Sequence, residues 1–172
     1  DCGHSGKTYG EIVTKPLPSR PNLEHLRAQA KDLLARVQAG LEGTWEFTAL
    51  EVEGNTMPAA ALGSSRLLMD GDRFRMESPE ASYEGIFNID VDSVPHHIDI
   101  QFVAGPEAGN SSYGLFELAG DELRICLGLT GASRPERFAT TPGSGHALES
   151  LRRSSRARPE SVTGGMPPGT VP

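Results

Sequence analysis

The chain has 172 residues, of which 37% are hydrophobic, and it carries a net charge of −7. This length fits one folded domain with flanking segments. No run approaches the roughly 18 consecutive apolar residues of a membrane helix, so we expect no membrane span. The negative charge is concentrated in residues 41–151, where 18 acidic residues stand against six basic ones, while both flanking segments are net basic. Because an acidic domain repels phosphate backbones, we expect the folded part to bind no nucleic acid.

The first ten residues, DCGHSGKTYG, contain Gly6-Lys7-Thr8, which looks like the end of a phosphate-binding loop. Such a loop requires the pattern G-x-x-x-x-G-K-[ST] between a strand and a helix. Asp1 occupies the position of the first glycine, and no alternation of strands and helices follows. The sequence therefore predicts no nucleotide site here. We interpret residues 1–21, which contain three prolines, as an irregular lead.

Residues 22–40 have the only clear helical pattern in the sequence. Pro21-Asn22 gives a start signal and Gly40 gives a stop signal. The apolar residues recur at helical spacing and form a single stripe, at Leu23, Leu26, Ala30, Leu33, Leu34 and Val37. Because a stripe of this kind is normally covered, we expect one of two arrangements. The helix packs on its own domain, over a face or into one end, or it binds a protein partner.

From residue 41 the apolar period changes to two, which is the period of β-strands. Alternating segments, such as the one around Ile98 and Ile100, are separated by turn signals at Asp70-Gly71-Asp72 and Gly120-Asp121. We predict about eight antiparallel strands in residues 41–153. An open sheet of this length would leave two unpaired edges, so we expect an all-β, up-and-down β-barrel. A barrel of eight strands encloses either a packed interior or one small ligand.

Several segments in this region resemble a bacterial family of uncharacterised lipocalin-like domains, the planctomycete-type domain. The resemblance is carried by LEGTW at 41–45, GDRF at 71–74, PHHIDIQF at 95–102, YGLFELAGDELRICLG at 113–128 and RPERFATTPGSGHALESLRR at 134–153. The Gly-x-Trp opening is also similar to the start of lipocalins in general. The resemblance covers about residues 41–153. It implies a small β-barrel, and it implies no activity and no catalytic residues.

A lipocalin-like barrel suggests an interior site with apolar walls and a few polar groups. The aromatic residues of the strands either line such a site or fill a closed core. Two arginines either hold a carboxylate or phosphate of a ligand or pair with the acids of the domain. The candidate ligand-binding residues are Trp45, Phe47, Tyr83, Phe87, Phe102, Tyr113, Arg124 and Arg134. Arg134 follows a Gly-rich connection, so we expect it either to fold over the barrel mouth or to tie down a loop.

His97 and Asp99 are the candidates for catalysis or metal binding. In a strand they project from one face, where they could act as acid and base or supply two metal ligands. A metal site needs a third ligand from another strand, for which Glu84, Glu117 and His146 are candidates. The alternative interpretation of this face is a polar surface turned toward solvent.

These observations lead to three hypotheses for the function. The first is a module that binds a small apolar or amphipathic molecule inside the barrel. The second is an accessory module with a filled barrel that binds a protein partner. The third is a hydrolase, isomerase or cyclase that uses His97 and Asp99. Cys2 and Cys126 form neither a disulfide framework nor a metal-ligand pattern, and we expect no cofactor.

The ends of the chain bear on its order and its location. Residues 154–172 have too little apolar content to fold, so we predict a disordered tail. The sequence has no signal-peptide pattern, and we expect a cytoplasmic protein. It would be secreted or periplasmic if an upstream export signal has been removed.

Overall fold

The computed structural model describes residues 23–155. The predictions of an irregular lead at 1–21 and of a disordered tail therefore lie outside this range, except for Ser154 and Ser155, which follow the last strand. The described elements are α1 (Leu23–Leu41), β1 (Gly43–Val52), β2 (Asn55–Pro58), α2 (Ala59–Leu62), β3 (Arg66–Asp70), β4 (Arg73–Glu77), β5 (Ser82–Asp90), β6 (His96–Ala104), β7 (Ser111–Ala119), β8 (Glu122–Gly128) and β9 (His146–Arg153).

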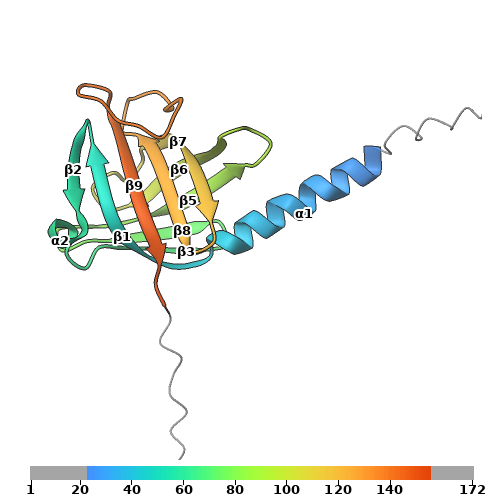
Figure 1. Ribbon diagram of the computed structural model, residues 1–172, viewed down its shortest axis with the longest axis horizontal. Helices are drawn as coiled ribbons and strands as arrows, with labels where there is room; N and C mark the ends of the chain where they lie inside the picture. Colours follow the sequence, from blue (N-terminus) through green and yellow to red (C-terminus); the bar gives the residue numbers. More distant parts are fainter. Residues whose placement is uncertain (1–22, 156–172) are drawn as a thin grey trace, which may run out of the picture.

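Eight of these strands form a closed antiparallel β-barrel (Figure 1). Each strand from β3 to β8 pairs with the next one along the chain, β1 pairs with β3, and the pairing of β1 with β9 closes the sheet. This confirms the predicted up-and-down barrel of about eight strands preceded by one helix. The hairpin turns at Gly71 and Gly120 have φ angles of 60° and 61°, which glycine adopts without strain.

Strand β1 has two different neighbours along one of its edges. Its residues 43–46 pair with β3, whereas its residues 49–52 pair with the short strand β2. A register shift between Phe47 and Ala49, on the edge that pairs with β9, marks the change. Beyond residue 46, β1 and β3 therefore separate, and β2 with helix α2 lies at this end of the barrel.

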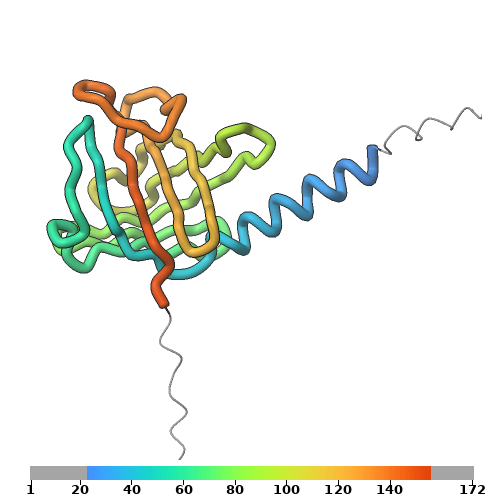
Figure 2. The backbone as a smooth tube through the Cα atoms, viewed as in Figure 1, coloured from blue at the N-terminus to red at the C-terminus, as the bar shows by residue number. Residues whose placement is uncertain are grey.

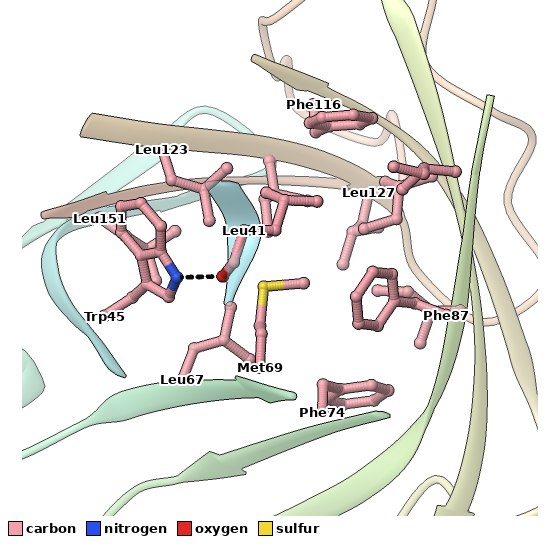
Figure 3. Packing of buried hydrophobic residues seen from close by; sticks show 14 of the residues in the cluster. Leu41, Trp45, Leu67, Met69, Phe74, Phe87, Phe116, Leu123, Leu127 and Leu151 are labelled. Atoms are coloured by element: carbon pink, nitrogen blue, oxygen red, sulfur yellow. Dashed lines mark hydrogen bonds between the residues drawn. The ribbon is translucent and has the colours of Figure 1, made fainter. Parts of the chain in front are cut away.

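The opposite end of the barrel, from which α1 leaves, is closed by Trp45. Its side chain is fully buried, and its indole Nε1–H donates a hydrogen bond of 2.8 Å to the Leu41 carbonyl oxygen (Figure 3). The Arg153 guanidinium lies 4.2 Å from the ring centroid, in cation–π contact. Beyond Trp45 the interior continues as one apolar cluster that includes Phe116 and Leu123. This end of the barrel is therefore filled by packed side chains.

Helix α1 does not pack along the barrel but projects away from it (Figures 1 and 2). Its apolar stripe is exposed, by 69% at Leu23 and by 44% at both Leu26 and Leu33. Only the last turns reach the core, where Leu41 is buried and Val37 packs against the cluster. The expectation that the helix covers a face or plugs an end of its own domain is therefore wrong. Leu41, which is anchored in the core, is the last residue of α1, so the preceding turns of the helix extend away from the barrel.

Candidate binding pocket

A pocket of about 420 Å³ lies at the end of the barrel opposite α1, and we call it the mouth pocket. It is framed by β1, β2, α2, β9 and the turn between β4 and β5. Its walls are mostly apolar and include Phe47 of β1, Met57 of β2 and Leu62 of α2, with Tyr83 of β5 as a polar member. Pockets that bind small molecules commonly have this size and this mixture of apolar walls and few polar groups.

A much smaller inner cavity, of about 40 Å³, lies deeper in the barrel. Its walls are apolar and include the rings of Phe74, Phe87 and Phe102. A volume of this size holds a few water molecules at most. Met76 and Glu149 line both spaces, so they form the boundary between the mouth pocket and the inner cavity.

Glu149 projects into the barrel from β9. It lies between Ala147 and Leu151, which are buried, and it pairs with Ile125 of β8 and Leu50 of β1. Residues directly opposite each other in antiparallel strands share a face of the sheet. Because Ile125 belongs to the core, the carboxyl of Glu149 faces the same interior.

The environment of this carboxyl is unusual for an acid. Within residues 23–155, no hydrogen bond or ion pair joins the Glu149 side chain to another group. Burial disfavours the charged form and raises the pKa of Glu149 from 4.5 to about 7. A titratable group with a perturbed pKa in a cavity is typical of functional sites. Glu149 is therefore the strongest candidate for a polar contact with a ligand.

Four of the predicted ligand-binding residues surround these two spaces. Phe47 and Tyr83 line the mouth pocket, whereas Phe87 and Phe102 line the inner cavity. Trp45 lies at the closed end of the barrel and lines neither space. The aromatic residues were expected either to line a ligand site or to fill a closed core. Some of them form a pocket wall, and others fill the core.

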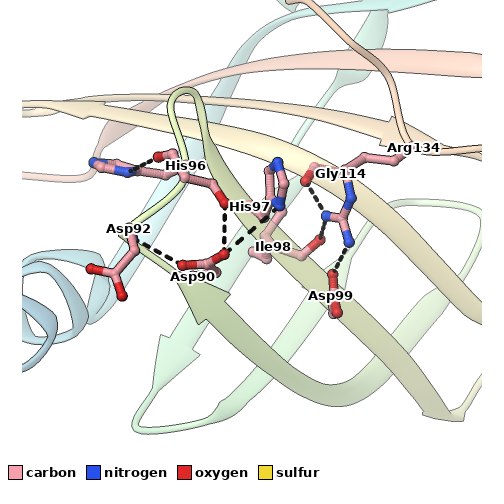
Figure 4. A network of polar contacts seen from close by, with 9 residues as sticks. Asp90, Asp92, His96, His97, Ile98, Asp99, Gly114 and Arg134 are labelled. Carbon is pink, nitrogen blue, oxygen red and sulfur yellow. Dashed lines mark hydrogen bonds and ion pairs between the residues drawn. The ribbon is translucent and has the colours of Figure 1, made fainter.

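The other three predicted ligand-binding residues lie on the outer surface. Arg134, in the loop between β8 and β9, donates hydrogen bonds of 2.7 Å to the Gly114 carbonyl oxygen and to the Asp99 carboxylate (Figure 4). Its guanidinium also lies 5.6 Å from the ring centroid of Tyr113, a half-exposed residue. Arg124 forms an ion pair with a glutamate of β7. Arg134 therefore ties down its loop, as one of the two expectations held, and it does not fold over the barrel mouth.

His97 and Asp99 lie on the outer face of β6 and line neither the mouth pocket nor the inner cavity. His97 Nδ1 is 4.0 Å from the Asp90 carboxylate, and Asp99 is held by Arg134 (Figure 4). A hydrogen bond from the Ser93 hydroxyl is the main cause of a lowered pKa at Asp90. In the described part of the chain, no three His, Cys, Asp or Glu side chains are grouped to hold a metal ion. The third ligand that the metal hypothesis requires is therefore not brought to this face.

Two features of the pocket were not predicted from the sequence. Glu149 was not a candidate, although the alternation in HALESLRR places it on the same face as Ala147 and Leu151. The signal in the sequence was an acidic residue, Glu149, at a position where the alternation predicts an apolar side chain. The walls supplied by β2 and α2 had no such signal, because the segment 55–62 is too short for a clear period.

The fold and the pocket define the class of protein: a closed antiparallel β-barrel with one packed end and one end that holds a pocket. No protein-family model matches the chain, and neither a curated protein nor a solved structure was found to be similar to it. Neither of the helices in residues 23–155 combines the length and the apolar character needed to cross a membrane.

Proposed function

We propose that this chain is a lipocalin-like binding module that takes a small apolar or amphipathic molecule into the mouth pocket. The observation that carries the proposal is a mostly apolar pocket of about 420 Å³ with the unpartnered carboxyl of Glu149 at its floor. The resemblance of residues 41–153 to the planctomycete-type lipocalin-like domains supports the same proposal, and we infer that the barrel belongs with them.

Apolar contact supplies most of the affinity in this proposal. Removing apolar ligand surface from water contributes roughly 25 cal/mol per Å². Phe47 and Leu62 offer matching surface, and the Tyr83 hydroxyl can fix a polar group. The inner cavity is too small for a further part of the ligand unless Met76 changes its rotamer. Methionine adapts readily in this way because its side chain is unbranched and flexible.

A tryptophan at position 61 is expected to block the mouth pocket. Ala61 lies on α2 and lines the pocket, so an indole ring there fills much of the space without entering the barrel core. We expect A61W to weaken binding of the neutral apolar dye N-phenyl-1-naphthylamine by about ten-fold or more, which corresponds to about 1.4 kcal/mol. The increase in dye fluorescence during titration measures the affinity.

Ala59 provides the matched control, since it lies on the same helix but does not line the pocket. A59W is expected to bind the dye as the parent protein does. An equal loss in both variants, or no loss in A61W, would contradict the mouth pocket as the binding site. A parent protein that shows no saturable dye binding would contradict the proposed function itself.

Self-association through α1 is a second candidate function, and the exposed stripe of the helix favours it. The residues of the stripe recur at spacings of three and four, as in the seam of a two-stranded coiled coil. The exposed ones are Leu23, Leu26, Ala30 and Leu33, and the next residue of the pattern, Val37, packs against the barrel. We propose that a second copy of the chain covers this stripe with its own α1, because the same apolar surface is then buried on both helices.

The double variant L26E/L33E is expected to convert such a dimer into a monomer, because it places charge in the seam. Light scattering during size-exclusion chromatography measures the mass. The control A28E/A35E adds the same charge on the opposite, exposed side of α1 and is expected to remain dimeric. A parent protein that is monomeric at every concentration would contradict the self-association.

A further inference from the structure

We propose that the molecule bound in the mouth pocket is an amine. Its protonated nitrogen is held by the Glu149 carboxylate, and its apolar body lies against Phe47 and Leu62. This inference rests on the proposed function and names the class of ligand for that same pocket. Three observations carry it: the charge of the lining, the lack of a partner for Glu149 and the position of its carboxyl.

The charge of the lining favours a cation. Glu149 lines both the mouth pocket and the inner cavity, and Glu80 lines the mouth pocket. Within residues 23–155, no lysine, arginine or histidine lines either space. A carboxylate or phosphate on the ligand would therefore face two like charges, whereas an ammonium group would face two opposite ones. This arrangement disfavours a fatty acid and favours an amine.

The Glu149 carboxyl lies inside the barrel and has no partner in the described part of the chain, whereas several other acids of the barrel have one. Glu77, for example, lies 2.6 Å from the Arg66 guanidinium, and the Glu51 carboxylate accepts a hydrogen bond from Thr140. In the described range 23–155, nothing of this kind reaches Glu149. A charge that is partly withdrawn from water and has no partner is less well stabilised than one that is paired. An ammonium group at this point would supply the opposite charge and up to three hydrogen-bond donors.

The titratable groups nearby offer this carboxyl no cationic partner. On the neighbouring strands, Arg124, Cys126 and Glu51 alternate with inward-facing residues and so point to the outer face of the barrel. Glu80 and Tyr83 share the mouth pocket, and neither carries a positive charge. A cation must therefore come from the bound molecule.

The position of Glu149 sets the orientation of the ligand. Its carboxyl lies at the boundary with the inner cavity, and thus at the floor of the mouth pocket. The nitrogen therefore enters first, and the apolar body trails toward Met57 and Leu62 at the β2–α2 side. Since the inner cavity of about 40 Å³ leaves too little room for a further group beyond the nitrogen, a primary amine with one apolar chain or ring fits best.

The test compares three probes with the same apolar chain: octylamine, 1-octanol and octanoate, titrated by calorimetry at pH 8. At this pH the amine is protonated, and the Glu149 carboxyl, with a pKa of about 7, is ionised. The parent protein is expected to bind octylamine about 10- to 100-fold more tightly than 1-octanol, with octanoate the weakest. E149Q keeps the shape of the side chain and is expected to bind octylamine no more tightly than 1-octanol. The control E46Q removes an exposed acid of β1 that lines neither space, and it is expected to change the octylamine affinity by about three-fold or less.

Each outcome distinguishes the ligand class from the binding function. Equal affinities for octylamine and 1-octanol in the parent, or an amine preference that persists in E149Q, would overturn the amine proposal and leave the proposed function standing. Failure of all three probes and of the neutral dye to bind would overturn both. A further measurement needs no variant: saturating octylamine is expected to lower the pKa of Glu149, followed by carboxyl ¹³C NMR, by about one unit or more. An unchanged pKa would overturn the amine proposal.

Discussion

Replacing Trp45 with alanine is expected to lower the free energy of unfolding by about 3–5 kcal/mol. Trp45 is fully buried, so removal of the indole leaves a cavity at the closed end of the barrel. The variant also loses the hydrogen bond to the Leu41 carbonyl oxygen and the ring that contacts the Arg153 guanidinium. Because Leu41 ends α1, the junction between the helix and the barrel is expected to loosen together with the core.

Urea denaturation followed by circular dichroism measures this change. Fluorescence is unsuitable, because Trp45 is the only tryptophan of the chain. The control W45F keeps an aromatic ring but lacks the N–H donor, and it is expected to lose about 1–2 kcal/mol. A loss below about 1 kcal/mol for W45A would contradict the role of Trp45 in closing the barrel.

Between about pH 4.5 and pH 7, Glu149 is expected to make the protein less stable as the pH rises. The carboxyl has its ordinary pKa of 4.5 in the unfolded chain, whereas burial raises the pKa to about 7 in the folded barrel. Between these values the folded state keeps a proton that the unfolded state has lost, so the free energy of unfolding decreases with pH. Below this interval both states are protonated, and above it the loss is complete. The total is about 2–3 kcal/mol once the partial exposure of the side chain to the pocket is allowed for.

E149Q removes this titration while keeping the size of the side chain. The free energy of unfolding of E149Q minus that of the parent is expected to rise by about 2–3 kcal/mol from pH 4.5 to pH 8, measured by urea denaturation at a series of pH values. Asp90 and Glu107 have pKa values lowered mainly by hydrogen bonds from Ser93 and Thr130, so their pH dependence has the opposite sign. Both proteins contain these groups, and their effect cancels in the difference. A difference that does not vary with pH would contradict a buried, titrating carboxyl at Glu149.

The barrel could be predicted because local signals determine it. Alternation of apolar residues sets the inner face of each strand, and the turns at Gly71 and Gly120 set the pairing of neighbouring strands. The packing of α1 could not be predicted in the same way. Helical periodicity identifies a stripe such as that of Leu26 and Leu33, but the surface that covers it depends on where the chain leaves the barrel.

The pocket was only partly predictable for a related reason. The alternation of apolar residues correctly predicts that Phe47 and Phe87 face the interior, and it places Glu149 on the inner face as well. The course of the loop that carries Arg134 depends instead on contacts with Gly114 and Asp99, which are distant in the sequence. The volume of the mouth pocket depends on how α2 sits beside β1, and no local pattern encodes that distance.

NMR of the methionine methyl groups tests the binding role of the mouth pocket most directly. Met57 and Met76 line this pocket, and Met69 lines the inner cavity. On titration with octylamine or with the neutral dye, we expect saturable shifts of the Met57 and Met76 methyl signals that are lost in A61W and kept in A59W. Methyl signals of Met57 and Met76 that stay unchanged at saturating concentrations of both probes would contradict binding in the mouth pocket.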